Sequence, residues 1–337
     1  MVTERKKKAP GGRTSLTMAD LAGLAGVSTI TVSRALSGSS LVSPETRERV
    51  QQLAGKHGYK LNVSARNLRL RRSHAVAVIV EMTPTPERTM WDPYPLALLG
   101  GISQELTSAQ YNVLLTTRQA AGDVVVQAAD GLILLGQGAH QDAVRAYDRL
   151  GLPMVVWGAA GVGGDQHIVV GSDNRHGGIS VAERFVSIGR RHPVFIGNPD
   201  HPEMAQRLFG FVDELGRHGI KPLLMRRADF TLESGVQAVR SLHNRHVQFD
   251  AIFACSDLVA MGAIRALIEL GLSVPEDVSV IGYDDTPQGA AFLPPLSSVR
   301  QNWQEGGVLL ARKVLGMIRG AAVESQMMPT ALVLRST

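Results

Sequence analysis

Three side chains near the start of the chain have the chemistry needed to read the bases of DNA. In the segment STITVSRALS, residues 28–37, the side chains of Thr29, Ile30 and Arg34 fall on one face if the segment is helical. Arg34 can donate two hydrogen bonds to guanine, Ile30 can contact the methyl group of thymine, and Thr29 can do either. Neighbouring hydroxyls complete the expected set of DNA contacts in this part of the chain, which is Thr17, Ser28, Thr29, Ile30, Thr31, Ser33 and Arg34.

Such side chains need helices to present them, and two short helices are expected on either side of Gly26. Thr17 can cap the first helix, and Asp20 lies in its first turn, where the helix dipole favours a negative charge. Gly26 tolerates the positive φ that ends a helix, and Ser28 can cap the second helix. A third helix is expected after Ser43. This order predicts a helix-turn-helix, although a small helical bundle with a polar face would share the pattern.

Charge is divided unevenly along the chain. Residues 1–72 contain 14 Lys and Arg against 4 Asp and Glu, whereas residues 73–337 contain 21 against 26. A basic front on an acidic body is typical of a polyanion-binding module attached to a second domain. The run RKKK, residues 5–8, is equally compatible with a solubilising tail, but the other basic residues lie within patterned sequence.

Length and composition exclude several classes of protein. The 337 residues suit two or three domains, and 44% hydrophobic residues can form substantial cores. Cys255 is the only cysteine, so no intramolecular disulfide is possible and a reducing compartment is expected. The apolar runs are shorter than the roughly 18 residues of a membrane span, and the basic start lacks the apolar stretch of a secretory signal. We therefore expect a cytoplasmic protein without a membrane partner.

From residue 74 the pattern changes to apolar runs of strand length that alternate with helical segments. AVAVIVEM and DGLILLG are two of these runs, and PEMAQRLFGFVDELGRHG is one of the helical segments. Strands that are apolar on both faces and alternate with helices predict parallel, doubly wound α/β sheets. The region is long enough for two such subdomains, with a ligand site in the cleft between them at the carboxyl ends of the strands.

Both halves of the chain contain motifs that resemble the LacI/GalR family of bacterial transcription regulators. In the front segment the resemblance is carried by VSTITVSRAL and ETRERV, and in the body by CSDLVAMGAIRALIELGLSVPEDVSVIGYDDTP, VGSDNRHGG and PPLSSVRQNWQEGG. It covers the chain from about Leu16 onward. The resemblance implies a three-helix headpiece of the helix-turn-helix type, a hinge helix, and two doubly wound subdomains of the periplasmic-binding-protein type.

The family also implies how the chain is divided. Residues 119–128 stand where relatives have a full helix and loop, so the first subdomain is expected to be shortened. The expected parts are a basic tail (1–15), a DNA-binding domain (16–60), a hinge (61–73) and a core (74–337), in which the N-subdomain spans about 74–170 and 303–328 and the C-subdomain about 171–302 and 329–337.

The expected hinge is basic and short. Alone, VSARNLRLRRS is too short for a stable helix and is compatible with a flexible linker. In the family the equivalent segment is a hinge helix that becomes ordered on operator DNA. The resemblance places Asn62 among the DNA contacts, Leu68 as the wedge between base pairs in the minor groove, and Ala65 against its dimer mate. The usual family proline is replaced by Leu61.

For the core, the resemblance implies a pocket for a small molecule, which we expect to be a sugar or a sugar derivative. Arg207 and Asp257 match polar pocket positions of the family, with a surface ion pair as the alternative. Tyr94, Phe230 and Trp303 match positions suited to the face of a sugar ring, with ordinary core aromatics as the alternative.

One pocket position departs from the family. Many relatives carry an aspartate where this chain has Gly158, and Trp157 adds bulk beside it. The common simple sugars are therefore not carried over as ligands. The expected effector contacts are Tyr94, Trp157, Arg207, Phe230, Asp257 and Trp303.

No other motif predicts chemistry. GAAGVGGD lacks the spacing of a dinucleotide loop, His243 and His246 lack a third metal ligand, and Asp284 and Asp285 should point apart at a strand end. We expect no catalysis, no metal and no cofactor.

These observations predict a homodimeric, sequence-specific DNA-binding regulator, a repressor of carbohydrate-utilisation genes that binds a palindromic operator in double-stranded DNA. A small-molecule effector in the core would change its affinity for DNA. Two alternatives share much of the pattern. The same fold could bind a non-sugar corepressor such as a purine, or the chain could be a small-molecule binding protein or a doubly wound enzyme without specific DNA binding.

Overall fold

A computed structural model describes residues 16–36, 38–59, 73–81, 90, 92–118, 126, 128–161, 167–225 and 230–337. The chain forms two compact units, Met1–Arg72 and Ser73–Thr337. The expected hinge residues Asn62, Ala65 and Leu68 lie outside the described residues. None of the helices in the described part of the chain is long and apolar enough to cross a membrane.

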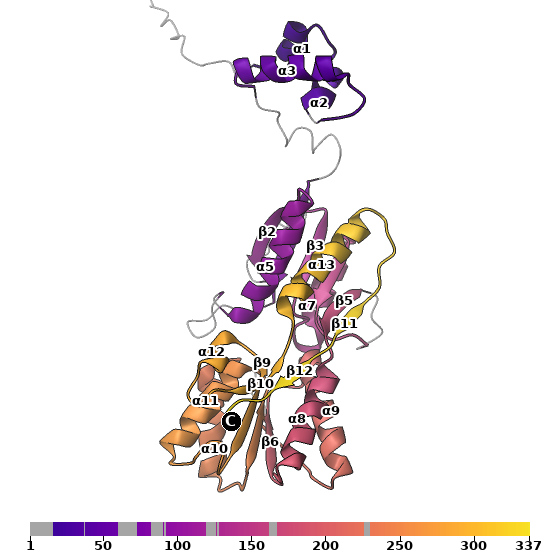
Figure 1. The fold of residues 1–337 in the computed structure, drawn as a ribbon. Coiled ribbons are helices and arrows are strands. Elements are labelled where there is room, and N and C mark those ends of the chain that lie inside the picture. Colours follow the sequence, from indigo (N-terminus) through magenta and orange to yellow (C-terminus); the bar gives the residue numbers. More distant parts are fainter. Residues whose placement is uncertain are drawn as a thin grey trace, which may run out of the picture. The chain divides into compact units, whose positions relative to one another are not determined.

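Three short helices make up the described part of the first unit, and its start agrees with the predicted caps (Figure 1). The amide of Asp20 donates to the hydroxyl of Thr17 at 3.2 Å, and the amide of Thr17 donates to the Asp20 carboxylate at 2.9 Å. Gly26, with a φ of 63°, ends the first helix. One fully buried side chain from each helix builds the core, namely Leu21, Val32 and Val50. The helices are α1 (Met18–Ala25), α2 (Thr29–Leu36) and α3 (Pro44–Lys56).

The second unit contains two six-stranded sheets. The strands of the first sheet are parallel and follow the order β11-β5-β4-β3-β1-β2. Its inner strands β1 and β3 are entirely buried, because both of their faces are apolar. The strands are β1 (Ala75–Val80), β2 (Asn112–Thr117), β3 (Gly131–Leu135), β4 (Met154–Trp157), β5 (Ile168–Ser172) and β11 (Gln326–Met328).

The second sheet follows the order β12-β10-β9-β8-β6-β7. All its pairs are parallel except that between β10 and β12, which is antiparallel. The predicted doubly wound architecture is confirmed, with one antiparallel edge strand added. The strands are β6 (Pro193–Ile196), β7 (Leu223–Met225), β8 (Ala251–Ala254), β9 (Ser279–Asp284), β10 (Ser297–Arg300) and β12 (Ala331–Val333).

Helices pack in pairs beside the two sheets. In the first sheet's layer, α5 and α13 approach closely, since a Cβ atom on Gly101 would lie 2.2 Å from the carbonyl oxygen of Gln304. Beside the second sheet, α8 packs against α9 and α10 against α11. The helices in the described part of this unit are α5 (Pro93–Ser108), η1 (Ala139–Gln141), α7 (Asp142–Asp148), α8 (Asn174–Ser187), α9 (Pro202–Arg217), α10 (Leu232–Asn244), α11 (Asp257–Glu269), α12 (Pro287–Ala290) and α13 (Trp303–Ile318).

The chain passes three times between the two sheet layers. It leaves the first layer after β5, returns to it between β10 and α13, and leaves it again between β11 and β12. Three connections allow the two layers to rotate against each other about one region of the molecule. We retain as a proposal the subdomain boundaries at residues 170/171, 302/303 and 328/329, of which the last two lie at these connections and the first lies within β5.

The edge strand β2 ends the first sheet on one side. It pairs only with β1, and Leu115 on this strand is 48% exposed. Between β2 and β3 the structure describes residue 118, the buried Val126 and residues 128–130. The shortening of this subdomain relative to the family therefore stays a prediction.

Candidate functional site

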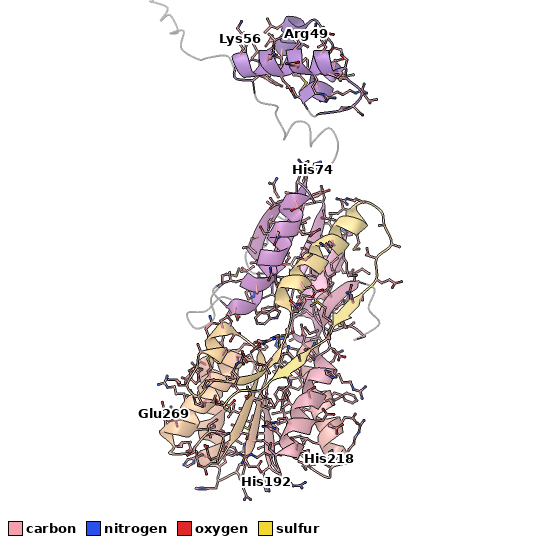
Figure 2. All side chains as sticks on the ribbon, viewed as in Figure 1. Arg49, Lys56, His74, His192, His218 and Glu269 are labelled. Carbon is pink, nitrogen blue, oxygen red and sulfur yellow. The ribbon has the colours of Figure 1, made fainter. Side chains whose placement is uncertain are left out.

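The second helix of the first unit exposes the side chains expected to read DNA. Thr29, Ile30 and Arg34 are all exposed, and 47% of the Ile30 surface is accessible although the side chain is apolar. Contact with a thymine methyl group would remove this apolar surface from water. Arg49 and Lys56 extend from α3 into solvent and add positive charge to the same unit (Figure 2).

The remaining hydroxyls of this set mainly cap helices. Ser28 accepts a hydrogen bond of 3.1 Å from the amide of Thr31, and the two hydroxyls lie 2.9 Å apart. Thr17 donates from its hydroxyl to Asp20 at 2.6 Å, and the hydrogen bonds from Thr17 lower the pKa of Asp20. Ser33 is half-buried on α2. Contacts of these four hydroxyl residues with DNA stay a prediction.

The second unit contains a cavity of about 830 Å³, which is within the usual size of ligand sites. Its walls come from the carboxyl ends of strands in both sheets and from the helices that follow them. Asp257 and Trp303 do not line it. Four of the six expected effector contacts do, namely Tyr94, Trp157, Arg207 and Phe230.

Arg207 of α9 is 5% exposed and held rigidly in the cavity wall. Its Nε donates to Asn174 Oδ1 at 2.8 Å, and its Nη1 donates to the carbonyl oxygen of Cys255 at 2.7 Å. The guanidinium group lies 3.5 Å from the centre of the Tyr283 ring, a cation–π contact. These contacts fix one positive charge before any ligand binds, which reduces the entropy lost on binding.

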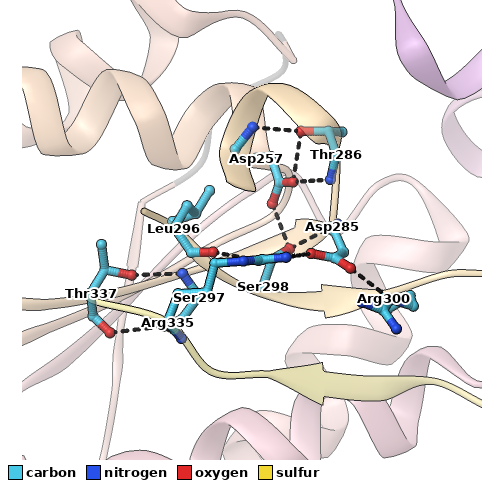
Figure 3. Close-up of polar contacts among 10 residues, drawn as sticks. Asp257, Asp285, Thr286, Leu296, Ser297, Ser298, Arg300, Arg335 and Thr337 are labelled. Atoms are coloured by element: carbon cyan, nitrogen blue, oxygen red, sulfur yellow. Dashed lines mark hydrogen bonds and ion pairs between the residues drawn. The ribbon is translucent and has the colours of Figure 1, made fainter. Parts of the chain in front are cut away.

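Asp257 does not take the expected place in the cavity. Its Oδ2 accepts hydrogen bonds from the amide and hydroxyl of Thr286 at 2.6 and 2.9 Å, and its Oδ1 accepts from the Ser298 hydroxyl at 2.5 Å (Figure 3). The side chain is 1% exposed, and burial raises its pKa to about 6 against the effect of these hydrogen bonds. As the first residue of α11, Asp257 ties that helix to the corner after β9, while its neighbours Ser256 and Leu258 line the cavity.

Asp284, at the end of β9, lines the cavity, although it is not among the effector contacts expected from the sequence. It accepts a hydrogen bond of 2.8 Å from Gln301, and burial raises its pKa well above the usual value although Arg207 opposes the shift. Its neighbour Asp285 points elsewhere and binds Arg300 and Arg335, each at 2.6 Å (Figure 3). The two carboxylates therefore point apart, as expected. A polar residue directly after a buried strand is the sequence signal that could have marked Asp284 as a cavity residue.

Trp303 packs against Tyr94, a residue of the cavity wall, and does not line the cavity itself. It is 7% exposed within the apolar core of the first sheet, and its ring lies edge-on to Tyr94 with the centroids 5.9 Å apart. Tyr94 itself lines the cavity near the start of α5. Trp303 therefore packs in this core beside Tyr94 instead of lining the cavity as expected.

The space beside Gly158 is occupied by Gln137. A Cβ atom on Gly158 would lie 2.5 Å from the Gln137 side chain. Gln137 is held by hydrogen bonds in both directions with the backbone of Ala159, at 2.8 and 3.1 Å, and it lines the cavity together with Trp157. A neutral amide therefore stands where many relatives are expected to have a carboxylate.

Phe230 offers an aromatic surface before α10. Its ring is edge-on to His201, with centroids 5.6 Å apart, and both residues line the cavity. An aromatic ring in a cavity wall suits contact with the C–H side of a sugar or with a flat base. The lining also includes acidic residues that the sequence analysis did not single out, which are Glu81, Asp92, Asp142, Glu203 and Glu233.

The fold and the cavity define a helix-turn-helix unit joined to a core like that of periplasmic binding proteins. A family model of bacterial regulatory proteins, lacI family, matches residues 17–62, and one of the periplasmic binding protein-like domain matches residues 182–337. The regulator CelR of Thermobifida fusca is 34% identical over 331 residues, which cover 95% of this chain and 96% of CelR. The chain belongs to the LacI family of bacterial regulatory proteins.

Other relatives agree with this assignment. The transcriptional repressor CytR of Escherichia coli strain K12 is 31% identical over 345 residues, covering 98% of both chains. A lac repressor dimer bound to operator and the anti-inducer ONPF superimposes with a TM-score of 0.82 at 27% identity, covering 96% of this chain and 99% of that one. A complex of CelR with cellobiose gives a TM-score of 0.72 at 32% identity, covering 95% and 99%. These relatives are transcriptional regulators.

Proposed function

We propose that this protein is a sequence-specific transcriptional repressor that binds operator DNA as a homodimer and responds to a sugar or sugar derivative. The observation that carries the proposal is the cavity, which combines a rigid arginine with two aromatic residues, in a chain that also has an exposed helix-turn-helix. Arg207 suits bidentate binding of hydroxyl groups, and Tyr94 and Phe230 suit the apolar face of a sugar ring. The lac repressor structures and the CelR–cellobiose complex support the same combination.

On the DNA side, the proposal gives Thr29, Ile30 and Arg34 the reading of bases in the major groove. Two copies in a dimer would read a palindromic operator, because protein symmetry is matched by symmetry of the site. Asn62, Ala65 and Leu68 would complete the interface in the minor groove. The protein would act in the cytoplasm, where its DNA lies, and as a regulator rather than as an enzyme.

Control by the effector follows from linkage between two sites. A ligand bound between the sheets shifts the balance between arrangements of the two subdomains, and residues 61–73 pass this shift to DNA affinity. By reciprocity, operator DNA must change effector affinity by the same factor. A flat purine acting as corepressor would fit Phe230 as well, and the sign of the effect on DNA affinity separates the two modes.

The test is to recover binding sites from fragmented genomic DNA of the source organism on the purified full chain. An enriched palindrome with a central pyrimidine–purine step, from which a sugar releases the protein, supports the proposal. Tighter operator binding with a purine selects the corepressor mode. Retention of DNA without any sequence preference contradicts specific regulation.

A further inference from the structure

The described residues that line the cavity carry more carboxyl groups than cationic groups. Among the described lining residues, Arg207 is the only arginine or lysine. Arg118 adds a second guanidinium group through its contacts with two of the lining carboxylates, and His201 adds an imidazole. The carboxyl groups are those of Glu81, Asp92, Asp142, Glu203, Glu233 and Asp284.

On the side of the first sheet, two carboxylates share one nitrogen atom. Nη1 of Arg118 donates to Glu81 Oε1 at 2.9 Å and to Asp142 Oδ2 at 2.8 Å. These residues follow β1 and β2 and begin α7, so the ends of the sheet elements bring them together. In these two contacts one guanidinium group faces two carboxylates, and among the described residues Oδ1 of Asp142 is buried without a hydrogen-bond partner.

On the side of the second sheet, the charge of Arg207 acts on the carboxyl groups of Glu203 and Asp284. Two nitrogen atoms of Arg207 donate to Asn174 and to the carbonyl oxygen of Cys255, so they are committed to neutral acceptors. The charge of Arg207 lowers the pKa of both carboxyl groups, but burial outweighs it and raises both pKa values. A carboxylate that is costly to ionise in an empty cavity is stabilised by a cation that enters it.

We propose that the effector carries an organic ammonium group, as an amino sugar does, and that Asp142, Glu203 and Asp284 receive this charge. The inference rests on the proposed function, since it takes this cavity as the effector site. An ammonium group donates up to three hydrogen bonds, and bonds between ionised partners are stronger than neutral ones. The aromatic faces of Tyr94 and Phe230 favour a sugar skeleton over a linear polyamine.

A neutral sugar fits these walls less well. It would displace water from several carboxylates while supplying hydroxyl groups that carry no compensating charge. The ammonium form of the same sugar supplies both hydrogen bonds and a positive charge. The cavity should therefore discriminate between two sugars that differ only in whether they carry a neutral group or an ammonium group.

The experiment measures binding to the full chain by isothermal titration calorimetry, below the pKa of the ligand amine. The ligands are cellobiose, the β-1,4-linked disaccharide of glucosamine and its N-acetylated form, which share a linkage and differ at carbon 2. Spermidine serves as a cation without a sugar skeleton. We expect the glucosamine disaccharide to bind at least about tenfold more tightly than either neutral disaccharide.

Two isosteric variants locate the charge effect. Asp142→Asn and Glu203→Gln should each reduce the preference for the ammonium ligand over cellobiose by about tenfold. Glu183→Gln, which neutralises an exposed glutamate of α8 away from the cavity lining, should leave the preference unchanged.

The outcomes separate this inference from the proposed function. Equal or tighter binding of a neutral disaccharide overturns the inference, as does the absence of binding by both ammonium compounds. Binding of spermidine without binding of the glucosamine disaccharide would support recognition of an ammonium group and contradict an amino sugar as the effector. Enrichment of an operator from genomic DNA needs no ligand, so it tests specific DNA binding independently of the effector. Specific DNA binding can therefore be found when the ammonium ligand does not bind, and binding of the ammonium ligand can be found when no operator is enriched.

Discussion

Arg335 donates a hydrogen bond of 2.6 Å to Asp285, and this contact holds the corner that aims Asp284 at the cavity (Figure 3). Arg300 binds the other carboxylate oxygen of Asp285 at 2.6 Å, and Arg335 also donates to the carbonyl oxygen of Leu296 at 2.7 Å. Asp284 and Asp285 have φ values of 117° and 55°, conformations that cost a non-glycine residue on the order of 1–3 kcal/mol each. The ion pairs offset this cost.

Substitution Arg335→Ala should therefore weaken effector binding although Arg335 does not line the cavity. We expect about a tenfold loss of affinity for the effector that releases the operator, because the corner after β9 would relax and Asp284 would move. Titration calorimetry measures the loss, and Arg319→Ala, which removes an exposed arginine at the end of α13, is the matched control. Lower thermal stability with unchanged effector affinity would contradict the positioning role.

Substitution Asp257→Ala should destabilise the core rather than act on the ligand directly. It would leave the amide and hydroxyl of Thr286 and the hydroxyl of Ser298 without their acceptor, at a cost of roughly 2–4 kcal/mol. Denaturant unfolding followed by circular dichroism measures the change, with Glu183→Ala on exposed α8 as the control. A loss of effector binding at unchanged stability would instead restore Asp257 as a ligand contact.

The buried Asp257 carboxyl also makes stability depend on pH. Its pKa is raised to about 6 in the folded protein, above the value of about 3.9 in an unfolded chain. The folded state thus binds this proton more tightly, so the stabilising contribution is present below about pH 4 and is lost as the pH rises through about 6. The unfolding free energy of the wild type minus that of Asp257→Asn should decrease as the pH rises from about 4 to about 6. A difference that does not change with pH would contradict the raised pKa of Asp257.

Arg34 should determine which DNA sequence is bound. Arg34→Ala should abolish the preference for operator over random DNA, while nonspecific binding changes little, because a base contact carries sequence information and a phosphate contact does not. Competition binding with both DNAs measures the ratio. Arg49→Ala removes a similarly exposed charge from α3 and should keep the preference. An equal loss on operator and random DNA would show that Arg34 only contacts phosphates.

The packing of Gly158 against Gln137 should make the site intolerant of a larger residue. Gly158→Ala forces the Gln137 side chain to move and should cost about 1–3 kcal/mol, together with a loss of effector affinity. Gly216→Ala is the matched control, since its Cβ atom would enter open space on α9 and should stabilise the helix by roughly 0.5–1 kcal/mol. Thermal unfolding tests both variants, and full tolerance of alanine at Gly158 would contradict the packing argument.

The first unit was predictable because its signals are local. Thr17, Gly26 and Ser28 act on amides and carbonyls within a few residues, so the pattern defines both helix ends and exposed faces. The long, apolar strands of the core were predictable for the same reason. Short edge strands such as β7, β11 and β12, of three residues each, carry too little pattern to be recognised before their neighbours are known.

Some features of the cavity could likewise be predicted from the sequence, and others are set only by the tertiary structure. The sequence by itself predicted the helix-turn-helix and the two doubly wound sheets, since periodicity, caps and motif spacing are properties of nearby residues. The resemblance to the family placed Arg207 in the pocket, and Arg207 lines the cavity. Only the tertiary structure decided that Asp284 faces the cavity while Asp257 is buried against Thr286 and Ser298. The direction of each carboxylate depends on hydrogen bonds to residues 13 or more positions away along the chain, and folding alone brings those partners together.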